Sequence, residues 1–349
     1  MEESRTEKVL PLQERKQKLM NQVALQDFLE EWNSQSPTIT VHTSGSTGTP
    51  KQLLVEKRRM LASARMTCDF LGLRPGDTAF LCMPMQYIAG KMMVVRSIER
   101  DLHLIAVEPS GHPLAHPLHD IQGELFGAMV PLQVWNSLQI PAEREQIKRF
   151  HQLIIGGGSI SSELEQELRT FPNAVWSTYG MTETLSHIAM RRLSGPHATK
   201  WYTPLPGIKI GQDENQCLTI QAPELNEEKL FTHDIVEINA KGQFIVKGRL
   251  DNVICSGGIK IQIEEVEEQL SFIGRNSYQI TAVPDSKFGE VAVLLSTRNI
   301  NLQALKERIT NPYWMPRHVI HVDELPRTET GKPDRARARI IAAQATGKV

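Results

Sequence analysis

The chain has 349 residues, of which 40% are hydrophobic and 23% are charged. These fractions are typical of an ordinary globular protein and exclude an intrinsically disordered one. There are 39 lysines and arginines against 40 aspartates and glutamates, so no net charge attracts nucleic acid. The N-terminal residues lack the apolar stretch of a signal peptide, and no run approaches the roughly 20 apolar residues that span a bilayer. We therefore expect a cytoplasmic protein that binds neither nucleic acid nor membrane.

The length favours a large domain followed by a smaller one. Near the start, helical spacing predicts a helix over residues 19–32, and β-branched alternation predicts a strand over 38–42. A second short strand is expected at 52–55 and a helix at 57–71. The glycine-rich segment 43–51 is therefore expected to join two strands.

The middle of the chain alternates between strand and helix patterns. Short buried strands are expected at 78–83, 102–107 and 153–155, and a helix is expected to begin at Ser161 or Ser162. This alternation predicts a layered α/β architecture for the first domain.

Later segments have a different pattern. Residues 201–249 contain short strands separated by Gly, Pro and Asn turns, which predicts a β-rich subdomain. The remaining residues read as strand, helix, strand, strand and helix, which predicts a small α+β domain. We therefore expect an N-terminal domain over 1–250 and a C-terminal domain over 251–349. The basic C-terminal segment is expected to form an amphipathic helix with Ile340 and Ile341 turned inward, rather than an RNA-binding stripe.

The segment 43–51, TSGSTGTPK, is rich in groups that bind phosphate. Its glycines let backbone N–H groups approach an anion, its hydroxyls donate hydrogen bonds and its lysine adds a positive charge. The residues concerned are Thr43, Ser44, Gly45, Ser46, Thr47, Gly48 and Lys51. It is not a Walker A loop, because Pro50 stands where that motif has glycine and Gln52 follows the lysine. A polar hairpin without a ligand is the alternative interpretation.

At this loop the sequence begins to resemble the adenylate-forming superfamily of acyl-CoA synthetases, luciferases and peptide synthetase adenylation domains. The segment STYGMTET, residues 177–184, resembles the family's adenine and magnesium segment. The resemblance implies that Tyr179 stacks on adenine beside Gly180. It also implies that Thr182 and Glu183 take part in catalysis, with Glu183 holding Mg²⁺. The glycines expected on the other face of adenine are Gly156, Gly157 and Gly158.

Two further segments resemble the family's ribose site. The tripeptide THD at 232–234 implies that Asp234 accepts hydrogen bonds from the two ribose hydroxyls. His233 departs from the glycine that is usual there. The segment that begins GRLDN at residue 248 resembles the family's hinge and places Arg249 near the ribose and phosphates.

The same hinge resemblance implies that the C-terminal domain is mobile about Asp251. Residues 325–335, LPRTETGKPDR, resemble the loop whose lysine, here Lys332, completes the adenylation site. When the domain swings about Asp251, Lys332 is withdrawn and a second loop approaches the thiol of coenzyme A. That loop consists of Ser256, Gly257 and Gly258.

The chemistry agrees with these residue types. A carboxylate that attacks the α-phosphorus of ATP must overcome repulsion between two anions, so the site needs cations and aimed donors. Mg²⁺ at Glu183, the loop 43–51 and Lys332 supply them, and the substrate is already ionised, so no general base is needed. Coenzyme A then attacks the acyl adenylate and AMP leaves. We therefore expect a ligase that uses ATP, Mg²⁺ and coenzyme A with a small-molecule carboxylic acid.

Within the superfamily, YGMTETLSHIA at 179–189 is most similar to the o-succinylbenzoate:CoA ligases of menaquinone synthesis. His187 departs from the usual Gln, and Tyr87 stands where many relatives carry His. We interpret Tyr87, Ser186 and His187 either as substrate-pocket residues or as plain core. Few residues precede the phosphate loop, so we expect part of the usual N-terminal subdomain to be missing.

Two other functions stay open. One is an adenylating enzyme that acts on another aryl or fatty acid, or that passes its acyl group to a carrier-protein thiol. The other is a non-catalytic module that senses ATP or AMP, against which Glu183, Asp234, Arg249 and Lys332 argue. The sequence also leaves the oligomeric state open between a monomer and a homodimer.

Overall fold

The computed structural model describes residues 12–42, 52–274, 276–328 and 333–347. The described chain divides into two compact units. The first contains the residues up to Lys209 together with Gln221–Lys229, and the second contains Ile210–Ile220 and the residues from Leu230 onward. The expected domain boundary at residue 251 stays a prediction. No helix in the described ranges is long and apolar enough to cross a membrane.

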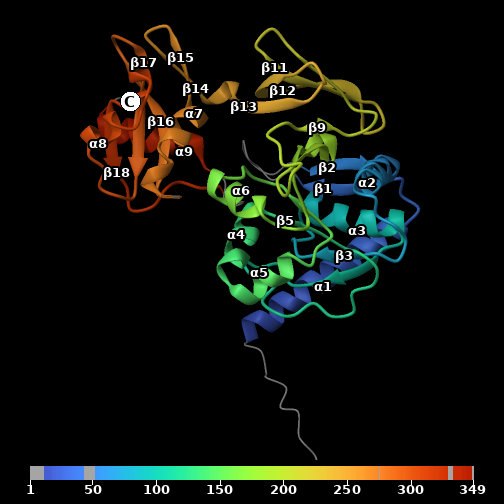
Figure 1. The fold of residues 1–349 in the computed structure, drawn as a ribbon. Helices are drawn as coiled ribbons and strands as arrows, with labels where there is room; N and C mark the ends of the chain where they lie inside the picture. Colours follow the sequence, from blue (N-terminus) through green and yellow to red (C-terminus); the bar gives the residue numbers. More distant parts are fainter. Residues whose placement is uncertain (1–11, 43–51, 275, 329–332, 348–349) are drawn as a thin grey trace, which may run out of the picture. The chain divides into compact units, whose positions relative to one another are not determined.

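A mostly parallel sheet forms the centre of the first unit (Figure 1). Its strands lie in the order β4-β3-β5-β6-β7-β8-β9; the pairs from β4 to β7 are parallel, whereas β8 is antiparallel to both β7 and β9. Their bounds are β3 Thr78–Leu81, β4 His103–Ala106, β5 Leu125–Met129, β6 Gln152–Ile155, β7 Ala174–Gly180, β8 His187–Arg192 and β9 Thr203–Pro204. Every residue of β5 is buried, as expected for a parallel strand that is covered on both faces. The predicted α/β architecture is confirmed.

Helices cover both faces of this sheet, with α4, α5 and α6 on one face and α2 and α3 on the other (Figure 1). The helices of the first unit are α1 Leu12–Asn33, α2 Lys57–Leu71, α3 Ile88–Arg100, α4 Pro131–Gln139, α5 Pro141–Ile147 and α6 Ser162–Arg169. The predicted helix over 57–71 is confirmed. It ends at Gly72, which adopts the left-handed conformation with φ of 70° and donates its N–H to the Asp69 carbonyl.

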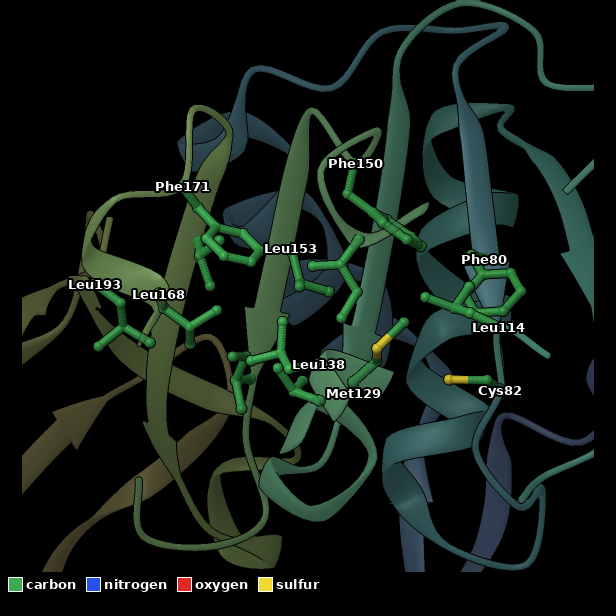
Figure 2. Close-up of a cluster of buried hydrophobic side chains, with 14 of the residues drawn as sticks. Phe80, Cys82, Leu114, Met129, Leu138, Phe150, Leu153, Leu168, Phe171 and Leu193 are labelled. Carbon is green, nitrogen blue, oxygen red and sulfur yellow. The ribbon is translucent and has the colours of Figure 1, made fainter. Parts of the chain in front are cut away.

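A cluster of buried apolar side chains fills the space between the sheet and α4, α5 and α6 (Figure 2). Phe80 and Phe150 meet edge to face in this cluster, with ring centroids 5.7 Å apart. Gly127 is required beside them, because a Cβ there would lie 2.4 Å from the Phe150 ring. This core fixes the carboxyl ends of β6 and β7, where the predicted adenine segments begin.

A separate pair of strands flanks the predicted phosphate loop. Strand β1, Thr38–His42, pairs antiparallel with β2, Gln52–Glu56, from Thr38 opposite Glu56 to His42 opposite Gln52. The prediction that 43–51 joins two strands is therefore confirmed. The loop itself lies outside the described residues.

A second sheet follows in the order β10-β11-β12-β13 (Figure 1). Its strands are β10 Lys209–Gln212, β11 Cys217–Ala222, β12 Asn226–Ile238 and β13 Phe244–Arg249. This sheet is the predicted β-rich subdomain. Antiparallel pairing of β12 with β13 places Asp234 directly opposite Arg249.

A third sheet, in the order β15-β14-β17-β16 with β18 parallel to β17, carries the C-terminal part. Its elements are β14 Val253–Ser256, β15 Ile259–Gln262, α7 Ile263–Gln269, β16 Tyr278–Asp285, β17 Gly289–Ser296, α8 Leu302–Lys306, β18 His318–His321 and α9 Arg335–Thr346. Alternate residues of β17 face opposite sides of the sheet. Val291, Val293 and Leu295 pack in the cluster that contains α9, whereas Ala292 and Leu294 pack in the one that contains α7 and α8. The predicted α+β character is confirmed.

The C-terminal helix α9 differs from the expectation in the residues that it buries. Ala338 and Ala342 are fully buried, Ile341 is partly buried and Ile340 is 58% exposed. The expectation that both isoleucines face inward is therefore wrong for Ile340. Residues four apart share one face of a helix, and the small alanine side chains let that face lie close to β16.

Candidate active site

The glycine segment 156–158 follows β6 and lies against the neighbouring strand β7. The Gly156 N–H donates to the Met129 carbonyl at 3.1 Å, and a Cβ at Gly156 would lie 2.4 Å from Thr178 Oγ1. Gly157 has φ of 80°, a conformation that favours glycine. The fold therefore brings the two segments that were expected to flank adenine side by side at the carboxyl ends of parallel strands, the usual place for ligands in such sheets.

A tight turn connects β7 to β8 and carries the predicted metal ligand. Thr182–Thr184 form a 3₁₀ turn, and the following Leu185 has φ of 63°, which bulky side chains rarely adopt. The buried Thr184 hydroxyl lies 2.7 Å from the Ser186 carbonyl and also contacts the backbone of Met181 at 3.0 Å. Strained backbone of this kind is concentrated at functional sites.

Tyr179 lies near the end of β7, and Glu183 lies in the 3₁₀ turn that follows it. The half-buried Tyr179 ring meets Tyr202 edge to face at 6.0 Å, and Glu183 is exposed. In the part of the chain that the structure describes, no group of three or more His, Cys, Asp or Glu residues could hold a metal ion. A single exposed carboxylate instead suits Mg²⁺, which binds proteins through one or two carboxylates plus substrate phosphates. Glu183 would therefore hold Mg²⁺ together with the phosphates of ATP.

The predicted ribose and hinge residues form a chain of ion pairs in the second unit. Arg249 contacts Asp234 through Nη1 at 3.2 Å and donates from Nη2 to Asp251 at 2.7 Å. His233 Nδ1 lies 2.5 Å from the other oxygen of Asp251. Burial would raise the pKa of Asp251, but the hydrogen bond and charge of Arg249, followed by those of His233, outweigh it and lower that pKa. The residue that departs from the family pattern, His233, thus joins the predicted pivot.

The predicted CoA-side loop is the tip of the hairpin between β14 and β15. Gly257 and Gly258 have φ of 58° and 83°, as the two central residues of a type I′ turn require. The Gly257 N–H also donates to the Phe288 carbonyl at 2.7 Å. The position of Ser256, Gly257 and Gly258 in a tight hairpin follows from this sequence, whereas their role beside coenzyme A stays a prediction.

Some predicted site residues lie outside the described residues. They are Thr43, Ser44, Gly45, Ser46, Thr47, Gly48, Lys51 and Lys332. Their roles in binding phosphate and in adenylation stay predictions.

A buried arginine that the sequence analysis missed lies beside a predicted pocket residue. Arg96 on α3 is 2% exposed, and its Nη2 donates to Ser186 Oγ at 2.6 Å while Nη1 lies 3.8 Å from Met93 Sδ. Its Nε has no hydrogen-bond partner, and no carboxylate among the described residues pairs with the guanidinium. Burial lowers the pKa of Arg96 to about 10, so the side chain is still charged at neutral pH.

His187, the first residue of β8, continues this polar group. It is 7% exposed, with Nδ1 3.3 Å from Ser186 Oγ and Nε2 2.9 Å from Thr67 Oγ1 on α2. Burial and then the charge of Arg96 lower the pKa of His187 well below its ordinary value, so the ring is neutral. Two of the three pocket candidates, Ser186 and His187, therefore contact each other beside a buried cation.

The third pocket candidate, Tyr87, is half-buried and immediately precedes α3, the helix that carries Arg96. Its role stays a prediction. The signal that could have revealed Arg96 was its place directly after the apolar run MMVV at 92–95. A charged residue there is either turned outward or buried with a function, and only tertiary packing distinguishes the two.

Comparison with known families identifies the chain. The model of the AMP-binding enzyme family matches residues 2–221. The chain belongs to this family.

Individual relatives refine this assignment. The solved acyl-CoA synthetase (AMP-forming)/AMP-acid ligase II-like protein from Dyadobacter fermentans is 35% identical, covers 92% of this chain and 94% of its own, and has a TM-score of 0.63. The 2-succinylbenzoate–CoA ligase of Enterococcus faecalis is 24% identical over 349 residues, 90% of this chain and 72% of that enzyme. The o-succinylbenzoate CoA synthetase of Bacillus subtilis, solved with ATP and magnesium, is 21% identical over 85% of this chain and 69% of its own, with a TM-score of 0.71, and shows the fold alone. This AMP-binding chain is an adenylate-forming acyl-CoA ligase.

Proposed function

We propose that this ligase activates o-succinylbenzoate in menaquinone biosynthesis, forming an acyl adenylate from ATP and then a thioester with coenzyme A. The observation that carries the proposal is the buried guanidinium of Arg96, which pairs with no carboxylate in the part of the chain that the structure describes. The activity of the Enterococcus faecalis relative supports the same substrate.

The charge of the substrate explains why Arg96 matters. o-Succinylbenzoate carries two carboxylates, of which one reacts with ATP while the other stays ionised. Burying a carboxylate or a guanidinium alone is costly, whereas a hydrogen-bonded pair of the two offsets much of that cost. Arg96 has free hydrogen-bonding capacity at Nε and lies beside Ser186, which follows Leu185 just after the 177–184 segment. A fatty acid or benzoate would leave this cation without a counter-charge.

The roles proposed for the other residues follow from the charges of the reaction. Mg²⁺ bound at Glu183 would neutralise phosphate charge, which is the chemistry that the metal supplies. Tyr179 and Gly156–Gly158 would hold adenine, and Asp234 would accept hydrogen bonds from the ribose hydroxyls. The loop 43–51 and Lys332 would donate to the phosphates as charge develops on the departing pyrophosphate.

The second half reaction needs a different arrangement. The thiolate of coenzyme A attacks the acyl carbonyl of the adenylate, the bond between carbonyl carbon and phosphate oxygen breaks, and AMP leaves. We propose that the C-terminal domain, residues 251–349, turns about Asp251 between the two halves, which withdraws Lys332 and brings Ser256–Gly258 towards the thiol. Small domains gate many enzymes in this way.

A substrate panel tests the proposal. Purified protein is incubated with ATP, Mg²⁺, coenzyme A and either o-succinylbenzoate, benzoate, succinate or a medium-chain fatty acid, and AMP and thioester are identified by mass spectrometry. We expect both products with o-succinylbenzoate only. AMP with a different acid would retain the ligase and contradict the substrate, and AMP without a thioester would indicate a carrier-protein acceptor.

A further inference from the structure

A continuous line of polar side chains connects two helices through the start of β8. It runs from Arg96 on α3 through Ser186 and His187 to Thr67 on α2, with contacts of 2.6, 3.3 and 2.9 Å. The Thr67 hydroxyl also lies 3.1 Å from the Ser63 carbonyl. These residues are buried or partly buried, so each contact is made away from bulk water.

The hydrogens that each group carries determine which atom donates and which accepts in each of these contacts. Arg96 can only donate, so the Ser186 oxygen accepts from it and the Ser186 hydroxyl hydrogen points to His187 Nδ1. Nδ1 is then unprotonated, and the Nε2 hydrogen is donated to Thr67 Oγ1. The Thr67 hydroxyl donates in turn to the Ser63 carbonyl. The opposite tautomer would leave the hydrogen of the partly buried Ser186 hydroxyl without an acceptor among these groups, which is costly.

The backbone around the line leaves little room for rearrangement. Gly180 pairs with His187 across an irregularity in the β7–β8 ladder, and a Cβ at Gly180 would lie 2.3 Å from the Ser186 carbonyl oxygen. The segment that carries Tyr179 is therefore in van der Waals contact with the segment that carries Ser186 and His187. Because Arg96 Nη2 donates to Ser186 Oγ, a contact that holds the Ser186 side chain in place also sets the orientation of the Arg96 guanidinium.

From this geometry we propose that His187 is a positioning residue: it holds Ser186, and through Ser186 the Arg96 guanidinium, in the orientation that receives the second carboxylate of the substrate. The inference rests on the proposed function. A glutamine side chain can accept from Ser186 with its oxygen and donate to Thr67 with its amide, so we expect His187→Gln to preserve both hydrogen bonds. A leucine of similar size can do neither, so His187→Leu releases the Ser186 hydroxyl and lets Arg96 turn.

The kinetic test compares two acids in the full-length enzyme. The acids are o-succinylbenzoate and 4-oxo-4-phenylbutanoate, which lacks only the ring carboxylate, and kcat/KM is measured by ATP–pyrophosphate exchange. We expect His187→Leu to lower the preference for o-succinylbenzoate about tenfold, mainly through its KM, and His187→Gln to keep it within about threefold. In an Arg96→Met background the same leucine substitution should leave the preference unchanged, because the group that it orients is gone. Equal losses with both acids, or the same loss in both backgrounds, would show a structural role instead.

A spectroscopic test does not depend on the substrate. In enzyme labelled with ¹⁵N-histidine, the signals that disappear in His187→Gln belong to His187, and we expect a neutral ring protonated at Nε2. A ring protonated at Nδ1, or at both nitrogens, overturns the positioning role even if o-succinylbenzoate is the substrate. A wild-type enzyme that ignores o-succinylbenzoate overturns the proposed function and, with it, the role of His187 towards the second carboxylate.

Discussion

At the scale of single residues, two arginines on α3 show how differently the fold treats one type of side chain. Arg100 is partly exposed and pairs with Asp69 at 2.5 Å and with Glu99 at 3.3 Å. Arg96, one turn earlier, is fully buried and has no carboxylate partner among the described residues. An unpaired buried charge lowers stability, and this cost supports the proposal that a carboxylate of the substrate completes the pair.

Replacing Arg96 separates stability from function. We expect Arg96→Met to leave the free energy of unfolding unchanged or slightly higher, because an apolar side chain of similar length replaces a desolvated charge. The same change should lower kcat/KM with o-succinylbenzoate about 100-fold, the equivalent of roughly 2.7 kcal/mol, in the range measured for hydrogen bonds to charged groups. Urea denaturation and ATP–pyrophosphate exchange measure the two effects.

Arg100→Met is the matched control. It removes the hydrogen bonds to Asp69 and to the Leu73 carbonyl, so it should destabilise the chain slightly while kcat/KM stays within about twofold of wild type. If both substitutions lower kcat/KM to the same extent, Arg96 has no special part in recognising the acid.

The ion-pair chain at Asp251 predicts a dependence of stability on pH. The folded-state pKa of Asp251 is lowered, so its contribution is present above the unfolded-state pKa, about 3.9, and is lost as the pH falls through the folded-state value. Since the Asp251 side chain is 41% exposed, screening keeps the contribution below about 1 kcal/mol. The difference in unfolding free energy between wild type and Asp251→Asn should therefore shrink from about pH 5 to about pH 2. A constant difference over that range would contradict the pairing with Arg249.

Motifs predicted some of these residues and could not predict others. Asp234, Arg249 and Asp251 stand in recognisable segments, and antiparallel pairing of neighbouring strands brings two of them together. Arg96 stands in no motif, and its environment is created by residues 90 positions further along the chain. Its partner Ser186 was predicted as a pocket residue, but the position of the Arg96 cation beside Ser186 is seen only in the folded structure.

At the scale of elements, the ladder between β7 and β8 depends on a glycine. A Cβ at Gly180 would lie 2.3 Å from the Ser186 carbonyl oxygen and 2.5 Å from His187 Cα, both of which are backbone atoms that cannot turn away. Gly180→Ala should therefore lower the free energy of unfolding by about 1–3 kcal/mol. Calorimetry or urea denaturation measures this change.

Gly158→Ala provides the comparison for that experiment. The nearest atom to a Cβ at Gly158 is Pro131 Cγ at 3.7 Å, an ordinary van der Waals distance, so its effect on stability should stay within about 0.5 kcal/mol. Equal destabilisation by the two alanines would mean that the close approach of β7 to the Ser186 backbone is not what requires Gly180.

The limits of a helix were predictable where local sequence signals agree, whereas the face that a helix buries depends on tertiary packing. Helix α2 was predicted in full because its amphipathic pattern and the glycine at its end point to the same limits. Helix α9 was predicted as a helix, but its inward face was assigned to the larger side chains. The structure buries Ala338 and Ala342 there, since a small face allows closer packing than Ile340 would.

At the scale of the whole molecule, the proposed mechanism assigns the two half reactions to two arrangements of the C-terminal domain. We expect Lys332→Ala to abolish adenylate formation, which removes pyrophosphate exchange, and to leave thioester formation from supplied acyl adenylate within about threefold of wild type. This expectation follows from the proposal that the lysine supplies positive charge only where pyrophosphate departs. Equal damage to both half reactions would refute this division.

The most direct test of the central claim compares three acids on the unmodified enzyme. They are o-succinylbenzoate, 4-oxo-4-phenylbutanoate, which lacks the ring carboxylate, and 2-butyrylbenzoate, in which a methyl group replaces the chain carboxylate. Pyrophosphate exchange gives kcat/KM for each. We expect o-succinylbenzoate to exceed each monocarboxylate at least 100-fold, because only it both reacts with ATP and pairs with Arg96. A monocarboxylate that reacts as well as o-succinylbenzoate would contradict the claim that the buried arginine selects a dicarboxylic acid.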